Sequence, residues 1–414
     1  MSDRCFPALL IGWHDELKGN PPGIMNSQEV SGINAQENIQ ERSMSDLNTP
    51  VGVALVGTGF GLKVHLPALR DCPSTEVVAV YHRDRSRAEA IAQTHQIPQF
   101  SDDFSALLSR DDIQGICLST PPFLHYDMAT QALLAGKHVF LEKPATMTAD
   151  QAKSLYDLSR QQRLQITLNF EFRYIPAWMT LKAQLEQNTI GKPRLIKVDW
   201  LVPGRADASR PWSWHASAEA GGGSLGALGS HVFDYIAWLF GPIKQVCGRL
   251  ITSVAYRPDP VSGLPKAADA DDTCLILLEL LDGTPVQVSI SATAYSGRGH
   301  WVEVYGDRGA LRLGSDNPTD YVHGFKLWGA ELSDPLQEIP IPAAYDFPKT
   351  HPDGRIAPVA RVITHWADCI QQGQTSAPSI KEGVYAQLLM DRTQESHETG
   401  CWVPVPDLET FLEA

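Results

Sequence analysis

Short runs of apolar residues alternate with amphipathic stretches from residue 51 onward. These runs predict strands over 51–56, 76–81, 115–118, 138–141 and 165–169. Helical spacing of apolar residues predicts helices over 62–70, 86–95, 124–135 and 148–162, with a further amphipathic segment over 102–109. Alternation of strands and helices is typical of a doubly wound parallel sheet, so we expect an α/β domain over residues 51–170.

The pattern changes after about residue 171, where apolar and polar residues alternate over longer segments. This alternation predicts strands over 194–201, 274–281, 285–292, 301–305 and 310–313. Asp282-Gly283 fits a tight hairpin turn between two of them. Helices are expected over 229–240, 359–371 and 380–396. We therefore expect an α+β domain over residues 171–414 with a mostly antiparallel, open sheet.

Residues 1–50 lack this periodicity. They contain three basic and seven acidic residues, two adjacent prolines and several Asn and Gln residues. We expect a disordered extension here. The short apolar segment 6–13 is interrupted by proline and glycine, so we expect no signal peptide. Met44 is followed by Ser-Asp, as Met1 is, which points to a translation start at Met44. Intact mass spectrometry showing mainly the full-length species would contradict that start.

Composition and charge exclude several classes of protein. The 414-residue chain is 43% hydrophobic and 20% charged, which is typical of globular domains and enough for two cores. The net charge is −14 and no run of five Lys or Arg occurs, so we expect no binding to nucleic acid or to a membrane. The seven cysteines are widely separated and form no C-x-x-C pair. We therefore expect reduced thiols in a cytoplasmic protein without a metal site.

A glycine-rich loop follows the first predicted strand and precedes a helix. It reads Gly57-Thr58-Gly59-Phe60-Gly61. Gly57 permits a tight turn, Gly59 lets the backbone approach a pyrophosphate, and the helix N-terminus offers free N–H groups. Leu62 stands where the usual pattern has its third small residue. The setting of strand, loop and helix still favours a dinucleotide site over a plain tight turn.

The end of the second strand bears on the choice between NAD and NADP. An acidic residue about 20 positions after the glycines would bind the adenosine ribose. The strand ends instead in His82-Arg83, with Asp84 next. Arg83 can pair with a 2′-phosphate, so the sequence favours NADP over NAD. The alternatives are a solvated Arg83 and an Asp84 that turns toward the ribose.

Several motifs occur in the order found in one enzyme family. They are the glycine loop with His65 and Pro67, Ser119-Thr120-Pro121-Pro122 with His125, Glu142-Lys143-Pro144, Arg173 with Pro176, Gly221-Gly222-Gly223, and Gly229-Ser230-His231 with Asp234. In these motifs the chain resembles the glucose-fructose oxidoreductase and inositol dehydrogenase family (Gfo/Idh/MocA) from about residue 51 to residue 405. The resemblance implies an N-terminal Rossmann domain with a nicotinamide cofactor, and a substrate between that domain and the second sheet. It implies cofactor contacts from Ser119, Thr120, Pro121, His125, Glu142 and Lys143.

The resemblance also implies two catalytic residues. Lys143 matches the lysine beside the nicotinamide and the reacting carbon, where its ammonium can polarise a hydroxyl or carbonyl oxygen. The alternative is a surface lysine paired with Glu142. His231 matches the family's acid/base histidine, which exchanges a proton with the substrate hydroxyl. The alternative for His231 is a helix cap or a packing residue.

One departure from the family pattern concerns these two residues. The family usually has Asp two residues before the Gly of the Gly-x-His element, and this chain has Ala227 there. Asp234 lies three residues after His231 on the same helical face and can hold the imidazole, or it is structural. The resemblance therefore implies Lys143 and His231 without the family's carboxylate at this position.

The substrate wall is expected from two segments. Residues 169–174 follow the last strand of the first sheet and include Arg173, which can grip an anionic group. Residues 205–215 precede three glycines and include Trp214, which can stack on a sugar. We name Arg173, Trp214, Asp234 and His231 as substrate-binding candidates. The alternative is that the tryptophans only anchor an irregular loop.

Together these features predict an NADP- or NAD-dependent oxidoreductase. It would transfer hydride at a C–OH or C=O centre of a small sugar-, polyol- or cyclic-type substrate. The alternatives are a cofactor-binding sensor without turnover, and a lyase or epimerase that retains its cofactor. The family resemblance further implies a homo-oligomer, a dimer or tetramer, formed through the outer face of the second sheet.

Overall fold

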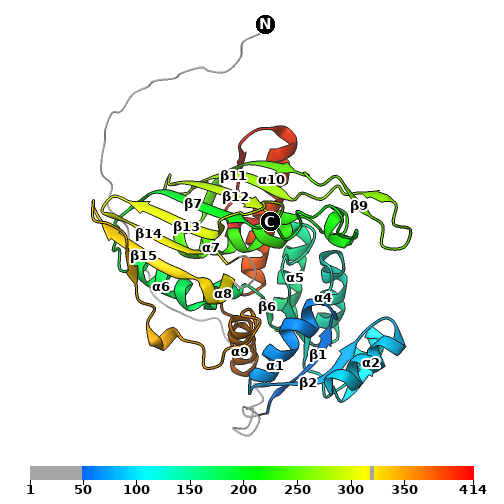
Figure 1. Ribbon diagram of the computed structural model, residues 1–414. Coiled ribbons are helices and arrows are strands. Elements are labelled where there is room, and N and C mark those ends of the chain that lie inside the picture. The colour runs from blue at the N-terminus through cyan, green and yellow to red at the C-terminus, as the bar shows by residue number, and fades with distance from the viewer. Residues whose placement is uncertain (1–48, 318–320) are drawn as a thin grey trace, which may run out of the picture. The chain divides into compact units, whose positions relative to one another are not determined.

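The computed structural model describes residues 49–317 and 321–414. The extension predicted over residues 1–50 and the proposed start at Met44 lie almost wholly outside the described residues. The described chain forms two large sheets and a separate two-stranded ribbon (Figure 1). None of the helices in these residues is long and apolar enough to cross a membrane.

The first sheet is parallel, in the strand order β3-β2-β1-β4-β5-β6. Its strands are β1 (Val51–Val56), β2 (Thr75–Tyr81), β3 (Gln99–Ser101), β4 (Gly115–Leu118), β5 (His138–Leu141) and β6 (Ile166–Leu168). Its helices are α1 (Leu66–Asp71), α2 (Arg85–His95), α3 (Phe104–Leu108), α4 (His125–Leu134) and α5 (Ala149–Gln162). This confirms the doubly wound sheet. Strand β3, at the sheet edge, was missed because only one of its three residues is apolar, whereas the equally short β6 is fully buried.

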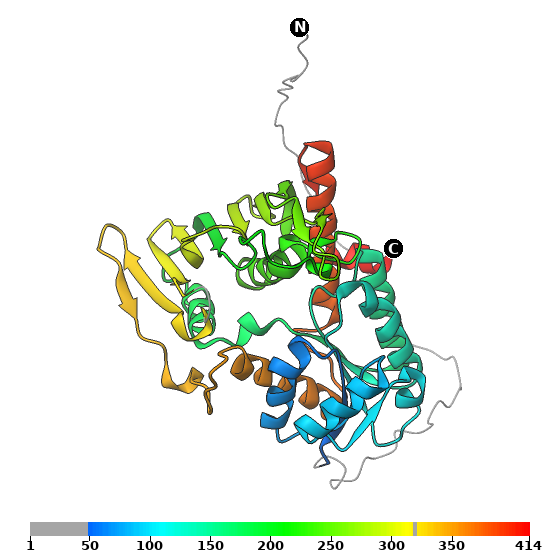
Figure 2. The ribbon, with the colours of Figure 1, turned by 45° about the vertical axis from the view of Figure 1, so that its right-hand side comes forward.

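Both faces of the first sheet are buried. In β1, Val53 and Leu55 pack in one hydrophobic cluster, while Ala54 and Val56 pack in the other. Trp366 of α9 (Ile356–Gln372) belongs to the first of these clusters, and in Figures 1 and 2 α9 lies beside α1. Helix α9 was expected in the second domain. Its strongly amphipathic sequence gives it an apolar face, but nothing in the sequence shows which sheet that face covers.

The second sheet has nine strands in the order β16-β15-β14-β13-β7-β12-β11-β8-β17. They are β7 (Pro193–Leu201), β8 (Ile243–Ile251), β11 (Thr273–Leu280), β12 (Pro285–Ser291), β13 (Gly299–Gly306), β14 (Gly309–Ser315), β15 (Lys326–Glu331), β16 (Gln337–Ile339) and β17 (Val403–Pro404). Only the β7–β12 pair is parallel. The mostly antiparallel sheet is thus confirmed, although β8, β15, β16 and β17 were not predicted. A separate ribbon pairs β9 (Tyr256–Pro258) with β10 (Pro265–Ala267).

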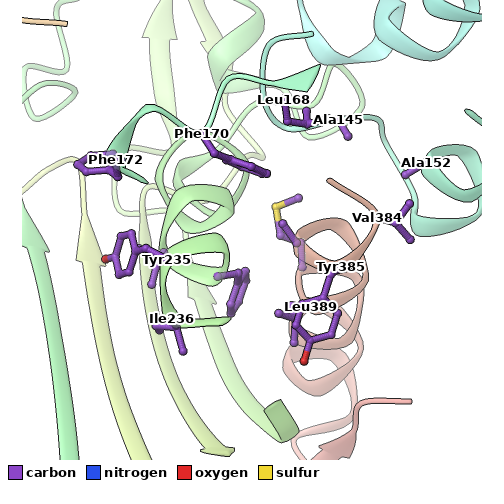
Figure 3. Packing of buried hydrophobic residues seen from close by; sticks show 14 of the residues in the cluster. Ala145, Ala152, Leu168, Phe170, Phe172, Tyr235, Ile236, Val384, Tyr385 and Leu389 are labelled. Carbon is purple, nitrogen blue, oxygen red and sulfur yellow. The ribbon is translucent and has the colours of Figure 1, made fainter. Parts of the chain in front are cut away.

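Helices cover one face of the second sheet. They are α6 (Pro176–Glu186), α7 (Ser230–Phe240) and α10 (Ile380–Thr399), while α8 (Tyr321–Gly324) and α11 (Leu408–Glu413) are short. Figure 3 shows Tyr235 of α7 pointing toward the strands, and Val384 of α10 pointing toward Ala152 of α5. Along β11, buried and exposed residues alternate, with Leu275 and Leu277 exposed on the uncovered face.

Candidate active site

The glycine loop has the geometry that a pyrophosphate requires. Gly57 has a φ of 105°, and a Cβ atom there would lie 2.5 Å from the backbone of Ser119, so a side chain would be strained and would clash. A Cβ at Gly59 would have no atom within 4 Å, which leaves open space above that backbone. The Ser119 hydroxyl donates to the Gly57 carbonyl at 3.1 Å and ties the ends of β4 and β1 together. The loop therefore fits a dinucleotide.

The loop leads into a π-helical turn, Gly61–His65, before α1 begins. The helix predicted over 62–70 is therefore divided between two geometries. Phe60 lies at the start of this turn with its ring edge-on to the ring of His65, at a centroid distance of 5.2 Å. Thr58 is half-buried in the loop. Single π turns in helices are frequent at functional sites.

Arg83 and Asp84 follow β2 at the edge where an adenosine ribose would lie. Arg83 is exposed. The Asp84 carboxylate accepts a hydrogen bond of 3.0 Å from the Arg87 backbone N–H and caps α2. Because Asp84 serves as the helix cap, the rotation toward the ribose that we considered from sequence would break that cap.

Glu142 and Lys143 follow β5 at the carboxyl edge of the first sheet. The buried Glu142 carboxylate accepts hydrogen bonds from His65 Nε2 at 2.7 Å and Asn169 Nδ2 at 2.6 Å. His65 Nδ1 lies 3.1 Å from Cys117 Sγ. Burial lowers the pKa of His65, but Cys117 and Glu142 outweigh it and raise the pKa to about 10. Burial raises the pKa of Glu142, but the bond from His65 brings it below its usual value. The pair is therefore an imidazolium and a carboxylate.

Lys143 reaches across to the second domain. Its Nζ donates to the Ala227 carbonyl oxygen at 2.9 Å. Ala227 lies in a second π-helical turn, Leu225–Gly229, which leads into α7. The position at which the family has a carboxylate thus still holds the lysine, but through its backbone oxygen.

His231, at the start of α7, faces Glu171 rather than Asp234. His231 Nδ1 lies 3.7 Å from Glu171 Oε2, and both residues are buried. Within residues 49–317 and 321–414, neither of these two atoms has a hydrogen-bond partner. Burial raises the pKa of Glu171 to about 7, although Lys143 lowers it. Burial, and then Lys143, hold the pKa of His231 well below its usual value.

Asp234 and Arg173 form a buried salt bridge with each other. Arg173 Nε and Nη2 donate to the two Asp234 carboxylate oxygens at 3.0 and 2.6 Å, and both side chains are largely buried. Asp234 therefore does not hold the His231 imidazole, because its carboxylate is already occupied by a guanidinium. Both residues line a different cavity, beside Trp238, and neither is among the residues around His231.

His125 is also placed differently from the expectation of a cofactor contact. It is fully buried, and its two ring nitrogens lie 2.9 and 2.8 Å from the carbonyl oxygens of Pro144 and Thr120. It supports the loops that carry Thr120 and Lys143 from beneath. Pro121 begins the short 3₁₀ segment Pro122–Leu124.

Seven of the predicted residues line one cavity of about 320 Å³, namely Phe60, Ser119, Thr120, Glu142, Lys143, Trp214 and His231. The part of its wall from the first half of the chain consists of Phe60, Ser119, Thr120, Pro122, Glu142, Lys143, Pro144, Asn169 and Glu171. The part from residues 200–355 consists of Trp200, Trp214, His215, Gly221, Ala227, Leu228, His231 and Arg355. Trp214 lies on this wall. Trp212 instead donates to the Ala267 carbonyl and lies against Lys266, so it anchors the loop.

Glu171 was expected only as part of the substrate wall over residues 169–174, and its proximity to His231 was not predicted. It lies three residues after the end of β6, and the carboxyl ends of parallel strands form the ligand edge of such sheets. This position predicted that the Glu171 side chain lies near the cleft. Its proximity to His231 depends on the packing of α7 against the segment Glu171–Tyr174, which the sequence does not show. Together, a lysine ammonium, a neutral imidazole and a buried carboxyl group can hold an oxygen and move its proton.

Comparison with known proteins identifies the family of this chain. Residues 51–170 match the Gfo/Idh/MocA model described as an oxidoreductase family, NAD-binding Rossmann fold, and residues 182–405 match its C-terminal alpha/beta domain. An uncharacterized oxidoreductase of Synechocystis sp. is 47% identical over 361 residues, which are 87% of this chain and 97% of that protein.

Two further comparisons concern levoglucosan dehydrogenase. The enzyme of Pseudarthrobacter phenanthrenivorans is 26% identical over 405 residues, covering 88% of this chain and all of that protein. A structure of levoglucosan dehydrogenase in complex with NADH and levoglucosan superposes with a TM-score of 0.77 and 24% identity, over 87% of this chain and 100% of that one. The chain therefore belongs to the Gfo/Idh/MocA family of oxidoreductases, with an NAD-binding Rossmann fold and a C-terminal α/β domain.

Proposed function

We propose that this oxidoreductase interconverts a C–OH and a C=O group of a small sugar-, polyol- or cyclic-type substrate. The observation that carries the proposal is the convergence of Lys143 and the His231–Glu171 pair on one cavity at the carboxyl edge of the first sheet. The similarity to levoglucosan dehydrogenase supports a sugar-like substrate. Trp200 and Trp214 add aromatic surface suited to sugar faces.

The glycine loop and the residues after β4 and β5 would hold the cofactor. Gly57, Gly59 and the N–H groups of the turn after them would receive the pyrophosphate, and Ser119, Thr120 and Lys143 would line the nicotinamide end. When bound, a nicotinamide supplies the acceptor or donor of the two electrons exchanged with the substrate carbon. Side chains of the protein would stabilise the charge on the substrate oxygen and exchange its proton.

Lys143 and His231 divide the work at the substrate oxygen. The Lys143 ammonium, held by the Ala227 carbonyl, stabilises negative charge that develops on that oxygen. Because His231 Nδ1 faces Glu171, Nε2 is the ring atom left to take the hydroxyl proton or return it. The Glu171 carboxylate then stabilises the imidazolium that forms, so Glu171 acts as a positioning residue.

Arg83 supports NADP as the preferred cofactor. It is exposed at the end of β2, and the neighbouring Asp84 caps α2, so a cation rather than a carboxylate is available to the ribose. The similar structure of levoglucosan dehydrogenase was determined with NADH, which favours NAD instead. Thermal stabilisation by NAD and NADP, measured separately, decides between them, because the shift grows with occupancy and affinity.

A homo-oligomer and a cytoplasmic location complete the proposal. The uncovered face of the second sheet exposes Leu275 and Leu277, each 48% accessible, which is suited to self-association. Multi-angle light scattering should show a dimer or tetramer that Leu277→Glu weakens. The six described cysteines are free thiols, which supports a reducing compartment.

The test of the proposed reaction is a substrate panel with the preferred cofactor. Sugars, polyols and their oxidised forms are offered, and the absorbance of the nicotinamide is followed. We expect turnover with at least one member, and a loss of about 10²- to 10³-fold in kcat for Lys143→Ala, whose fold is checked by circular dichroism. Cofactor binding without turnover across the panel would support the sensor instead. Nucleotide retained through purification would support the lyase or epimerase.

A further inference from the structure

A second cavity adjoins the one around His231. It has a volume of about 290 Å³ and lies among the segment 202–216, β9 and the residues before β11. His215 and Leu228 line both cavities, so these two side chains form the boundary between them. Three arginines line the second cavity, namely Arg205, Arg210 and Arg257.

Arg205 contacts His215 at this boundary, and one nitrogen of its guanidinium group has no acceptor among the described residues. Its Nη2 is 3.3 Å from His215 Nδ1. Its Nη1 is buried and has no hydrogen-bond partner among the residues that the structure describes. A buried N–H donor without an acceptor is costly, and more so on a charged group, so this guanidinium favours an acceptor from outside the chain.

The other two arginines donate to backbone carbonyl groups. Arg257 is buried and donates to the carbonyl oxygens of Asp207 and Arg205 at 2.8 and 2.6 Å. Arg210 is exposed and donates to the Gly204 carbonyl oxygen. Carbonyl groups satisfy donors but do not neutralise the positive charge, so both arginines add to the charge of the cavity.

Two aspartates also line the cavity, but their carboxylates are largely occupied. Asp271 Oδ2 accepts from the backbone N–H groups of Ser224 and Leu225, both at 2.9 Å. Asp272 Oδ2 accepts from the backbone N–H groups of Ser253 and Val254, both at 2.8 Å. The cavity wall therefore carries three guanidinium groups and two carboxylates, which leaves an excess of one positive charge, and backbone N–H groups already bind the carboxylates.

His215 remains neutral between the two cavities. Burial, followed by the charges of Arg205, Arg210 and Lys143, lowers its pKa to about 3. A neutral ring can accept from Arg205 through Nδ1, which holds that guanidinium at the boundary. The ring of Trp214, at a centroid distance of 3.7 Å, supports His215 from the side of the first cavity.

We propose that the second cavity is an anion subsite, in which Arg205 binds a carboxylate or phosphate group of the substrate. This inference rests on the proposed function, since it places the reacting carbon of the same molecule beside Lys143 and His231. It narrows the substrate to an anionic sugar or polyol, with the anionic group directed past His215. Bidentate pairing of a guanidinium with either group suits this role.

The test measures binding rather than turnover. Protein saturated with its preferred cofactor is titrated calorimetrically with glucose, glucuronate and glucose 6-phosphate. We expect one of the two anionic sugars to bind roughly 10- to 100-fold more tightly than glucose, the range that hydrogen bonds to a charged group provide. The stronger of the two identifies carboxylate or phosphate as the group. Equal binding of all three sugars would overturn the proposal.

Variants assign the effect to the cavity. Arg205→Gln should remove the preference for the anionic sugar and leave glucose binding unchanged. Arg194→Gln, which removes an exposed arginine of β7 outside both cavity walls, should retain the preference. A preference that survives Arg205→Gln would contradict the assignment. If Arg205→Gln does not fold, the exposed Arg210→Gln serves in its place, with an expected loss of a few-fold.

Failure of the subsite and failure of the proposed reaction give different results. If no sugar is turned over but the anion preference depends on Arg205, the subsite stands and the proposed reaction fails. If sugars are turned over but neutral and anionic ones bind equally, the reaction stands and the subsite fails.

Discussion

The two sides of the main cavity differ in how their buried polar groups are satisfied. On the side of the first sheet, Glu142 accepts from His65 and Asn169, and His65 also contacts Cys117. On the side of α7, the facing atoms of His231 and Glu171 lie 3.7 Å apart and have no hydrogen-bond partner within the described chain. Both sides are buried, so the difference is one of bonding and not of exposure.

This difference indicates two kinds of role. A fully bonded buried network stabilises the fold and fixes the backbone beside it, here that of Lys143. An unsatisfied buried donor or acceptor costs about 1–3 kcal/mol, and such groups are tolerated chiefly where a function needs them. We therefore expect changes at His65 to act on stability and changes at His231 to act on turnover.

The largest effect on activity is expected from His231→Asn. Asparagine retains a polar side chain but cannot exchange a proton near neutral pH, so kcat should fall by about 10²- to 10⁴-fold. Steady-state kinetics with the best substrate of the panel measures this loss. The midpoint of urea unfolding and the stabilisation by cofactor should stay close to those of the parent protein. A large loss of stability with kcat retained would show that His231 is a packing residue.

The matching change on the other side is His65→Leu. It removes the partner of a buried carboxylate, and breaking such a pair costs about 3–5 kcal/mol. Urea unfolding at pH 7 should show this loss in the free energy of unfolding. His95→Leu in α2, which faces no carboxylate of the site, is the control and should cost far less. Equal stability of the two variants would mean that the network contributes nothing.

A smaller effect is expected in the pH dependence of stability. The pKa of Glu171 rises from 4.5 to about 7 on folding, so the folded protein holds a proton that the unfolded chain has released between these values. Stability from this group is present below pH 4.5 and is lost as the pH rises through 7, by roughly 3 kcal/mol. Glu171→Gln should therefore be more stable relative to the parent at pH 8 than at pH 5. A constant difference across this range would contradict the raised pKa.

Much of the fold could be predicted from the sequence, because its signals are local. The apolar run of β1, the glycine loop and the period of α7 each depend on neighbouring residues only. The edge strand β16 was missed because it has only three residues, and its neighbour β15 was missed because most of its residues are partly or fully exposed. The position of α9 on the first sheet depends on packing between residues far apart in the chain.

The candidate site likewise combines features that local motifs predict with features that depend on packing between distant residues. Lys143 and His231 were identified by their motifs, and the structure places both on one cavity. The carboxylate that faces His231 was not predictable from the sequence. Asp234 lies near His231 in the sequence, whereas Glu171 lies near it only in the folded chain. Packing of α7 against the segment Glu171–Tyr174 decides that Arg173 takes Asp234 and leaves Glu171 for the imidazole.

The most direct test of the contrast between the two sides is the pH profile of kcat for alcohol oxidation by the parent protein and by Glu171→Gln. If the Glu171 carboxylate stabilises the imidazolium of His231, kcat of the parent protein should rise with pH through about 7. Glu171→Gln should lack this rise and should be about tenfold slower at pH 8, while Glu76→Gln, at an exposed site on β2, should behave like the parent. A rise near pH 7 that persists unchanged in Glu171→Gln would contradict the account.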